Sequence, residues 1–363
     1  MHRLGMLMLV IGLFTLVSFG MIPPASADGT ETLGAPSGPV ANGTGVAVAG
    51  AGMFEQPASF TVTVPANAVV NQVLLYWEAG HRHGDASGEE PDSSIRINGI
   101  DVEADGRIGG ETFFYGSAAG DVFTATHRVD ITNLGLVTAG STTVTVDGLD
   151  LDEVDDGAGV LVIYSEPGAE PFEIMLVDGN DIAFVNFEAP RDSTVPQSFT
   201  FAPAEIVRIA ELSMIVSSIH DPVPGCSCRP NFMEYTIAGE TTRLPDPFPD
   251  TEGREFDTAS FDITIPAGAS ELSVQMLSQF IEGDPNLPAS LVWLAAALAV
   301  QPAPTQPTTT MQPTTTTQPV AVLPTTAVLA FTGTSSPGPT LALGLAALGL
   351  GVTLVVFGRR RLT

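Results

Sequence analysis

Short stretches of alternating apolar and polar residues recur through the middle of the chain. They read "FTVTV" at Phe60–Val64, "SIRING" at Ser94–Gly99, "STTVTVDG" at Ser141–Gly148 and "FDITI" at Phe261–Ile265. A period of two places alternate side chains on one face of a β-strand, and the Pro, Gly, Asn and Asp residues between the stretches favour turns. No comparable stretch keeps a helical period. The pattern therefore predicts an all-β region from about residue 43 to residue 300.

The order of these stretches repeats along the chain. "FTVTVPANAVVNQVLLYW", which starts at Phe60, is similar to "FTFAPAEIVRIAELSMIV", which starts at Phe199. Three further similar pairs follow in the same order, starting at Ser94 and Glu234, at His127 and Ser260, and at Gly159 and Leu291. Such a repeat predicts two tandem β-sandwich, jelly-roll-like units at residues 43–168 and 169–300. Chance similarity between Val/Thr-rich strands is the alternative.

The N-terminal residues 1–27 have the composition of a signal peptide. An Arg is followed by an apolar run from Leu4 to Ile22, and the small residues Ala25–Ala27 suit cleavage after Ala27. These features predict export, with an uncut membrane anchor as the alternative.

The C-terminal region contains a stalk and a second apolar run. Residues 301–328 are rich in Pro and Thr, a composition that favours an extended polyproline II stalk. Within residues 329–363, the run Leu341–Phe357 would span about 26 Å as a helix at about 1.5 Å per residue. Three Arg residues at 359–361 follow it and favour the cytoplasmic side. The sequence therefore predicts a transmembrane helix at 341–357.

A pentapeptide precedes this helix, with the residues Leu329, Ala330, Phe331, Thr332 and Gly333. Pentapeptide, apolar run and Arg cluster together resemble the sorting signal of Gram-positive cell-wall proteins, whose usual pattern is Leu-Pro-x-Thr-Gly. Ala330 in place of Pro resembles the Leu-Ala-x-Thr-Gly variant associated with class E sortases.

That resemblance implies how the protein reaches its final location. A sortase would cleave between Thr332 and Gly333 and join the Thr332 carbonyl to an amine of peptidoglycan. The implied partners are a sortase and peptidoglycan, and the implied location is the cell wall. The C-terminal helix would contact the membrane only before sorting. An ordinary C-terminal tail anchor is the alternative.

The charge of the chain excludes some partners. There are 41 acidic residues against 13 basic ones, all of which are Arg, and the net charge is −28. Such a charge repels phosphate backbones and anionic lipids, so nucleic acid is excluded as a partner. Isopeptide staples and pilus polymerisation need a Lys amine, which the chain lacks and which an Arg guanidinium cannot replace. We therefore predict single-copy attachment to the wall.

Two regions carry candidate metal ligands. The acidic run "DLDEVDDG" at Asp150–Gly157 suits calcium, which prefers carboxylate oxygens, and a solvated acidic turn is the alternative. Two imidazoles two residues apart would point to one side of an extended chain and suit a transition metal, with ordinary loop histidines as the alternative. A predicted turn at Asp178–Asp181 is a second calcium candidate. The candidate ligands are Asp150, Asp152, Asp155, Asp156, His81 and His83.

Cys226 and Cys228 are separated by one residue in the predicted turn "GCSCRPN". Outside the cell they would close a small disulfide across the loop. A bridge to another chain and a metal site with His220 are the alternatives.

No motif for nucleophilic or metal-dependent hydrolysis occurs in the chain, and no Gly-rich phosphate loop follows a strand and opens a helix. The sequence therefore predicts a wall-anchored surface protein without catalytic residues, which serves in adhesion or binds a carbohydrate or another surface polymer. Its ligand loops are expected at the ends of the sandwiches. The alternatives are a structural coat protein without a specific ligand and a surface hydrolase with paired carboxylates.

Overall fold

The computed structural model describes residues 31–83, 92–117, 120–150, 156–219, 229–248 and 252–303. Their regular structure is antiparallel β-strand, apart from the single 3-10 turn η1 (Thr132–Leu134). The predicted all-β class is therefore confirmed for these residues. Among them, no helix is long and apolar enough to cross a membrane. The predicted signal peptide, sorting signal and helix at 341–357, and nearly all of the stalk, lie outside the described residues.

The first half of the described chain forms two sheets. A five-stranded sheet, called the first inner sheet below, has the order β2-β10-β4-β8-β7, and a four-stranded first outer sheet has the order β3-β9-β5-β6. The strands are β2 (Gly45–Gly52), β3 (Ala58–Val64), β4 (Val69–His83), β5 (Ser94–Ile97), β6 (Ile100–Glu103), β7 (Gly106–Ser117), β8 (Gly120–Asp130), β9 (Gly140–Asp147) and β10 (Gly157–Ser165).

The second half forms a similar pair. The second inner sheet has the order β1-β11-β18-β13-β16, and the second outer sheet has the order β12-β17-β14-β15. The strands are β1 (Leu33–Gly34), β11 (Glu173–Ala183), β12 (Gln197–Thr200), β13 (Arg208–Ser217), β14 (Phe232–Ile237), β15 (Glu240–Pro245), β16 (Phe256–Ile265), β17 (Glu271–Leu277) and β18 (Leu291–Val300).

Strand for strand, the two halves have the same order. In the inner sheets β2-β10-β4-β8 corresponds to β11-β18-β13-β16, and in the outer sheets β3-β9-β5-β6 corresponds to β12-β17-β14-β15. The four similar sequence pairs fall in corresponding strands. β4 begins nine residues after Phe60, and β13 begins nine residues after Phe199. Among the described residues, β7 has no counterpart in the second half.

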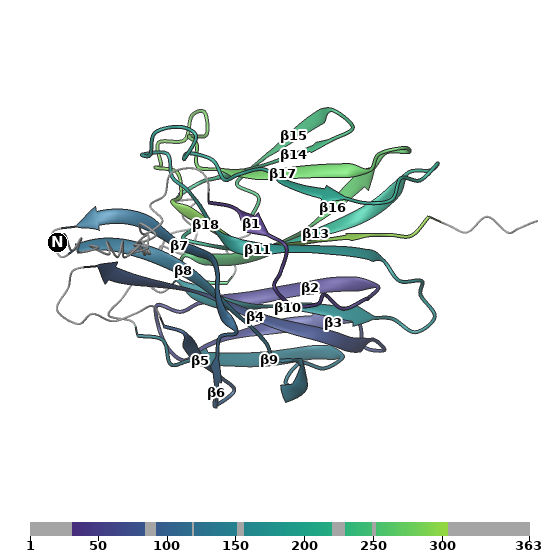
Figure 1. Ribbon diagram of the computed structural model, residues 1–363, viewed down its shortest axis with the longest axis horizontal. Coiled ribbons are helices and arrows are strands. Elements are labelled where there is room, and N and C mark those ends of the chain that lie inside the picture. Colours follow the sequence, from purple (N-terminus) through teal and green to yellow (C-terminus); the bar gives the residue numbers. More distant parts are fainter. Residues whose placement is uncertain are drawn as a thin grey trace, which may run out of the picture. The chain divides into compact units, whose positions relative to one another are not determined.

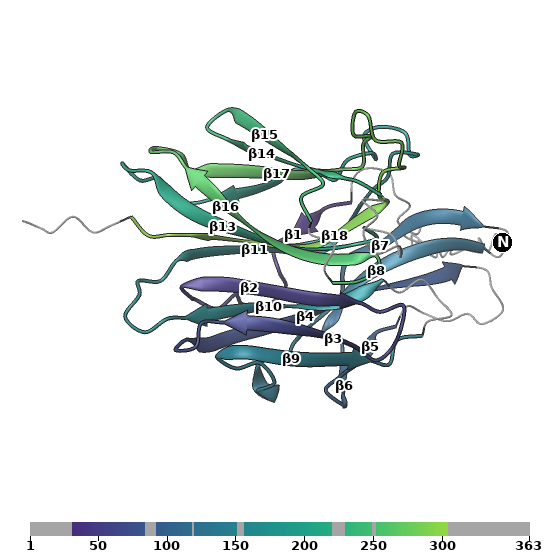
Figure 2. The same cartoon turned by 180° about the vertical axis from the view of Figure 1, so that it is seen from behind.

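Three layers of buried apolar side chains separate the four sheets. Phe60 of the first outer sheet packs with Trp77 of the first inner sheet, and Leu272 of the second outer sheet packs with Trp293 of the second inner sheet. Between the inner sheets lie Tyr76 and other apolar side chains of both halves. The sheets are thus stacked in the order first outer, first inner, second inner, second outer, which Figure 1 shows from bottom to top. The view from behind shows the same order (Figure 2).

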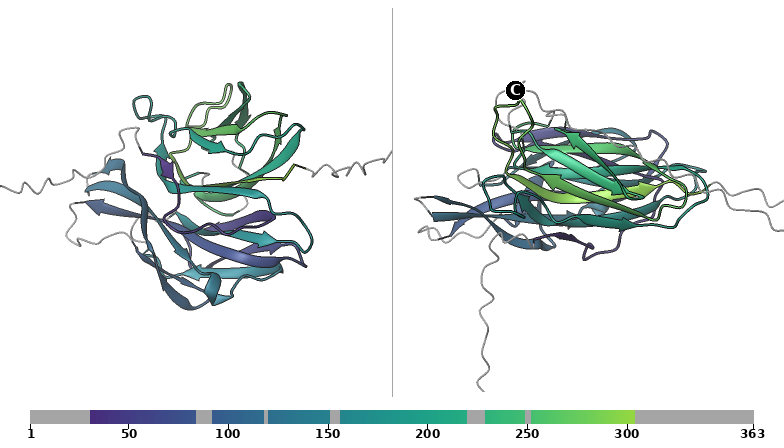
Figure 3. Two further views of the ribbon diagram at one scale, coloured as in Figure 1. Left: turned by 45° about the vertical axis from the view of Figure 1, so that its right-hand side comes forward. Right: turned by 90° about the horizontal axis from the view of Figure 1, so that it is seen from above.

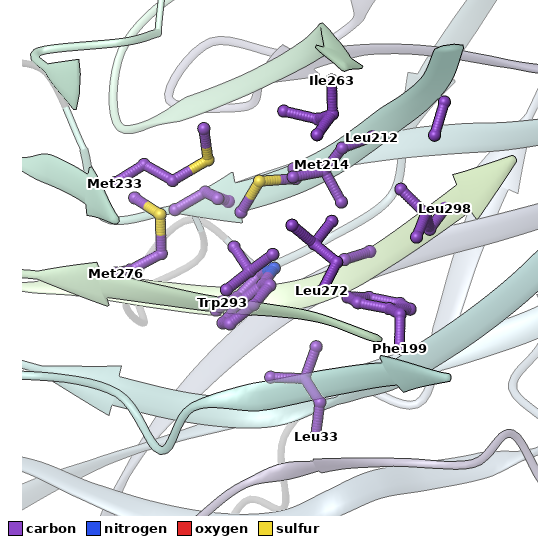
Figure 4. Close-up of a cluster of buried hydrophobic side chains, with 14 of the residues drawn as sticks. Leu33, Phe199, Leu212, Met214, Met233, Ile263, Leu272, Met276, Trp293 and Leu298 are labelled. Carbon is purple, nitrogen blue, oxygen red and sulfur yellow. The ribbon is translucent and has the colours of Figure 1, made fainter. Parts of the chain in front are cut away.

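This stacking explains why β18 reads "LVWLAAALAV". All ten of its residues are buried, because the second inner sheet is covered on both faces. Figure 4 shows one of these covered faces, where Leu33, Phe199, Leu272 and Trp293 gather from four different strands. The outer sheets keep an alternating pattern, as in β3, because their other face is exposed.

The inner sheets interlock through one aromatic ring. Phe256 of β16 lies against three glycines of the first inner sheet, and a Cβ atom at Gly50, Gly157 or Gly159 would lie 2.3, 2.6 or 3.1 Å from the ring. These glycines therefore let the two sheets approach closely. Figure 3 shows the two halves from further directions.

Polar contacts cross the same layer. Arg128 of β8 donates from Nη1 to Asp178 Oδ2 of β11 at 2.5 Å, and the Tyr76 hydroxyl donates to the same oxygen at 3.1 Å. Asn180 Nδ2 donates to the carbonyl oxygen of Thr124 at 2.9 Å. The predicted turn at Asp178–Asp181 is therefore wrong. The segment is part of β11, because the side chains of Asp178 and Asn180 find partners on the first inner sheet instead of in solvent.

Candidate functional site

The predicted metal ligands are distributed over separate places. Asp150 is exposed, Asp156 is completely buried directly before β10, and His81 is buried in β4. His83 lies in the same strand. Asp152, Asp155, Cys226, Cys228 and the pentapeptide Leu329–Gly333 lie outside the described residues. Within the described part of the chain, no group of three or more His, Cys, Asp and Glu residues could hold a metal ion.

His81 belongs to a small ion-paired group on the first inner sheet. Its Nε2 lies 2.9 Å from Glu111 Oε1, and its ring stacks on Phe123 at 6.1 Å between centroids. Arg107 Nη1 donates to the other oxygen of Glu111 at 2.9 Å. This arrangement positions the imidazole through one carboxylate and one ring.

His127 is buried beside Trp77, and the two rings stack with centroids 5.4 Å apart. Burial, together with the positive charge of Arg107, lowers the pKa of His127 to about 4. The imidazole is therefore neutral at physiological pH and packs against the ring of Trp77.

Asp156 is the predicted site residue with the most unusual environment. Its Oδ2 accepts a hydrogen bond from Ser218 Oγ at 2.5 Å, whereas its buried Oδ1 has no hydrogen-bond partner. Its backbone N–H donates to Glu78 Oε2 of β4 at 3.3 Å. Burial, and then the nearby charge of Glu255, raise the pKa of Asp156 to about 8, although the bond from Ser218 opposes the shift.

Arg229 links Ser218, the partner of this carboxyl group, to other residues of the second half of the protein. Its Nη1 lies 3.0 Å from Glu255 Oε1, and its Nη2 donates to the carbonyl oxygen of Ser218 at 2.8 Å and to Ser290 Oγ at 2.7 Å. Asp156 belongs to the first half of the chain, and its partner Ser218 follows β13 in the second. The contacts therefore connect the two halves beside the ring of Phe256.

A further carboxyl group lies at the same junction. Glu252 Oε1 accepts hydrogen bonds from the Gly50 N–H at 2.9 Å and from Thr258 Oγ1 at 2.8 Å, while its buried Oε2 has no hydrogen-bond partner. Burial raises the pKa of Glu252 to about 7. We call Glu78, Asp156, Ser218, Arg229, Glu252 and Glu255 the seam cluster.

The chemistry open to the seam cluster is limited by its burial. A carboxylic acid that stays protonated near neutral pH has the pKa of a general acid. Asp156 is 0% exposed, however, so a substrate cannot reach its carboxyl group in this arrangement. Its protonated form carries no charge, so the junction between the two halves avoids the free-energy penalty of a buried carboxylate.

A hollow surface lies elsewhere, on the second outer sheet. A groove with a volume of about 600 Å³ lies between the β14–β15 turn, the β16–β17 turn and the start of β17. It is lined by Thr236, Ala238, Gly239, Ala267, Gly268, Ala269, Ser270, Glu271 and Ser273. Sequence reasoning missed this groove, although two Gly-containing turns, "IAGE" and "PAGASE", contribute to it.

No protein family matches the chain, and no curated protein matches it. Among solved structures, the cycloalternan-forming enzyme from Listeria monocytogenes in complex with pentasaccharide substrate is 11% identical, with a TM-score of 0.22. That match covers 68% of this chain and 19% of the enzyme, so the chain spans about a fifth of its length. N-glycanase F (PNGase F) is 10% identical over 70% of this chain and 96% of its own, with a TM-score of 0.27. At such scores these likenesses carry no argument.

Proposed function

We propose that this chain is an exported surface protein, joined covalently to a Gram-positive cell wall, and that its folded part binds a carbohydrate or another surface polymer. The anchoring part rests on the ordered C-terminal sequence. A Pro/Thr-rich stalk, the pentapeptide Leu329–Gly333, an apolar run and three Arg residues follow one another. Each is weak alone, but the order is that of a sorting signal.

The observation that carries the binding part is the polar character of the outer sheets. On the first outer sheet, β3 and β9 carry exposed hydroxyl pairs, and the distances between their oxygens are 2.9, 3.3 and 3.2 Å. The pairs are Ser59 with Thr145, Thr61 with Thr143, and Thr63 with Ser141. Hydroxyl groups both donate and accept hydrogen bonds, as do the hydroxyls of a glycan. Such faces therefore suit a polar, uncharged polymer.

We also propose that the two halves are jelly-roll sandwiches derived from one duplicated unit, with the limits 43–168 and 169–300. The one-to-one strand order supports this, as does the equal spacing from Phe60 to β4 and from Phe199 to β13. Eight strands in two facing sheets of four fit the jelly-roll architecture once β1 and β7 are set aside.

A test of binding uses a glycan array with the purified full-length chain, together with an assay for release of sugars. Binding without turnover supports the proposal. If the chain shows no binding and no turnover, the result supports a structural coat protein without a specific ligand. Turnover supports a surface hydrolase, the alternative that paired carboxylates would allow.

Anchoring is tested by fractionating cells that express Thr332→Ala or Gly333→Ala. Thr332→Ala removes the hydroxyl and a methyl group on one side of the expected cleavage point, and Gly333→Ala adds a methyl group on the other side, so the variants should remain with the membrane or appear in the medium. Wild-type protein should be released by muramidase. Equal release of wild type and variants would contradict the proposed anchoring.

A further inference from the structure

The groove on the second outer sheet exists because of how one hairpin is placed. Ile237, the last residue of β14, pairs with Leu272 near the start of β17. In the first outer sheet, Ile97 at the end of β5 pairs with Val146 near the end of β9. The β14–β15 turn therefore lies beside the β16–β17 turn, and the space between the two turns is the groove.

The turn residues keep this space open. Ala238 and Gly239 have φ values of 51° and 83°, in the left-handed region. The corresponding turn in the first outer sheet has Asn98 and Gly99 at 47° and 78°. Asn tolerates this region better than Ala does, so Ala238 costs some stability. Its methyl group leaves room where an Asn side chain would project.

The polar groups of the groove are hydroxyls and one carboxylate. Thr236, Ser270 and Ser273 supply hydroxyls, and Glu271 supplies a carboxylate that accepts a hydrogen bond from Ser198 Oγ at 2.8 Å. A hydroxyl donates and accepts, whereas an ionised carboxylate only accepts. A ligand must therefore offer donors to Glu271 and both kinds of group to the hydroxyls.

The same lining disfavours other ligand classes. None of the groove's lining residues is basic, and the chain has a net charge of −28, so an anionic ligand would be repelled. The apolar side chains of the lining are Ala methyls, which form no pocket for a large apolar side chain. The combination fits adjacent sugar hydroxyls.

We propose that this groove is the binding subsite for a neutral glycan chain, with Glu271 as the charged acceptor and Thr236, Ser270 and Ser273 as hydroxyl partners. The inference rests on the proposed binding function and assigns it a place and a ligand class. It moves the expected site from the loops at the sandwich ends to an outer sheet and two of its turns.

The experiment measures binding to the purified full-length chain by calorimetry. The probes are uncharged hexasaccharides of N-acetylglucosamine and of β-linked glucose, with an acidic oligogalacturonate for comparison. Glu271→Gln removes a charge-assisted hydrogen bond and should weaken binding of the neutral probe about tenfold or more. Ala238→Asn should weaken it similarly by occupying the groove, and it should keep or raise the unfolding temperature.

Asn98→Ala is the matched control in the first outer sheet. It removes the hydrogen bond from the Thr145 N–H to Asn98 Oδ1, so it should lower the unfolding temperature without changing affinity. If Ala238→Asn loses affinity for the neutral probe while its unfolding temperature equals or exceeds that of wild type, the loss comes from the groove and not from impaired folding.

Two results would overturn the inference alone. In the first, Glu271→Gln and Ala238→Asn both bind the neutral probe as tightly as wild type does. The chain would then still bind a glycan, but at a different site. The other result is preference for the acidic probe. If the wild-type chain binds no probe here and no glycan on the array, the proposed binding function fails and the inference fails with it.

Discussion

At the residue scale, the seam cluster shows how much one buried carboxyl group depends on its surroundings. Asp150 and Asp156 belong to the same acidic run, yet Asp150 is exposed whereas Asp156 is completely buried against Ser218. Burial disfavours the ionised form, because solvent no longer stabilises the charge. The same residue type therefore has two roles within seven positions.

The raised pKa of Asp156 predicts a pH dependence of stability. Its folded-state pKa of about 8 lies above the unfolded value of about 3.9. The folded state thus binds more protons between these values, and the free energy of unfolding falls as pH rises through the window from about 4 to about 8. Asp181 and Glu252, with pKa values raised by burial to about 8 and about 7, act in the same direction. The lowered pKa of His127 acts in the opposite direction below about pH 6.5, because there the unfolded state binds more protons at this residue than the folded state does.

Asp156→Asn should therefore flatten this dependence. We expect a shallower decline of the unfolding free energy between pH 6.5 and 8.5 than in wild type, measured by urea denaturation, with each unit of lost pKa shift equal to about 1.4 kcal/mol. Asp150→Asn at the exposed end of the run is the matched control and should keep the wild-type slope. Identical slopes in wild type and Asp156→Asn would contradict the assigned ionisation.

At the element scale, the close approach of β16 to β2 and β10 depends on glycine. Gly50→Ala would place its Cβ 2.3 Å from the Phe256 ring and 2.9 Å from the carbonyl oxygen of Ala158. One of these groups must move, and overpacking of this kind costs about 1–3 kcal/mol. Thermal and urea unfolding measure this loss.

Gly34→Ala in the edge strand β1 is the control for that loss. A Cβ at Gly34 would meet no atom within 4 Å, so the stability should change little. If both variants unfold like wild type, the packing of Phe256 against glycine is looser than described.

At the scale of the whole folded part, the shared apolar layer between the inner sheets predicts coupled unfolding. Trp77 and Trp293 are both fully buried, one in each sandwich core. In Trp77→Phe only the second core retains its Trp, and in Trp293→Phe only the first does. In each variant the urea transition followed by Trp fluorescence should coincide with that followed by far-ultraviolet circular dichroism. Separate midpoints would mean that the sandwiches unfold independently.

The absence of Lys predicts a chain without internal amide cross-links. Arg stays protonated and cannot act as the nucleophile that an isopeptide bond needs. The intact mass of the processed chain should therefore show no loss of ammonia or water. The only mass loss expected is that of the two hydrogens removed by a disulfide. Muramidase digests should likewise contain no ladder of this protein linked to itself. A loss of ammonia or water would contradict the absence of internal cross-links, and a ladder of the linked protein would contradict single-copy attachment.

The sequence by itself determined the β class of the described chain and much of its order. Alternation in "FTVTV" and "STTVTVDG" is a local property with a period of two, so β3 and β9 could be predicted with their buried faces. The similarity of the stretches at Phe60 and Phe199 indicated a shared strand order. The sequence did not indicate the groove. It named Asp156 as a calcium ligand, and the structure places this residue in the seam cluster, where the described residues include no group of three or more His, Cys, Asp and Glu that could hold a metal ion.

Only the tertiary structure decided how the sheets are stacked and where polar groups find partners. Phe256 packs on Gly50, which is about two hundred residues away in the sequence, and Asp178 pairs with Arg128 on a neighbouring sheet. Neither contact can therefore be recognised from a local sequence pattern. The same holds for the groove, which depends on β14 pairing with β17 near its start. Strand patterns specify which face of a sheet is buried, but the free energy of packing one sheet on another depends on side chains that meet only in the folded chain.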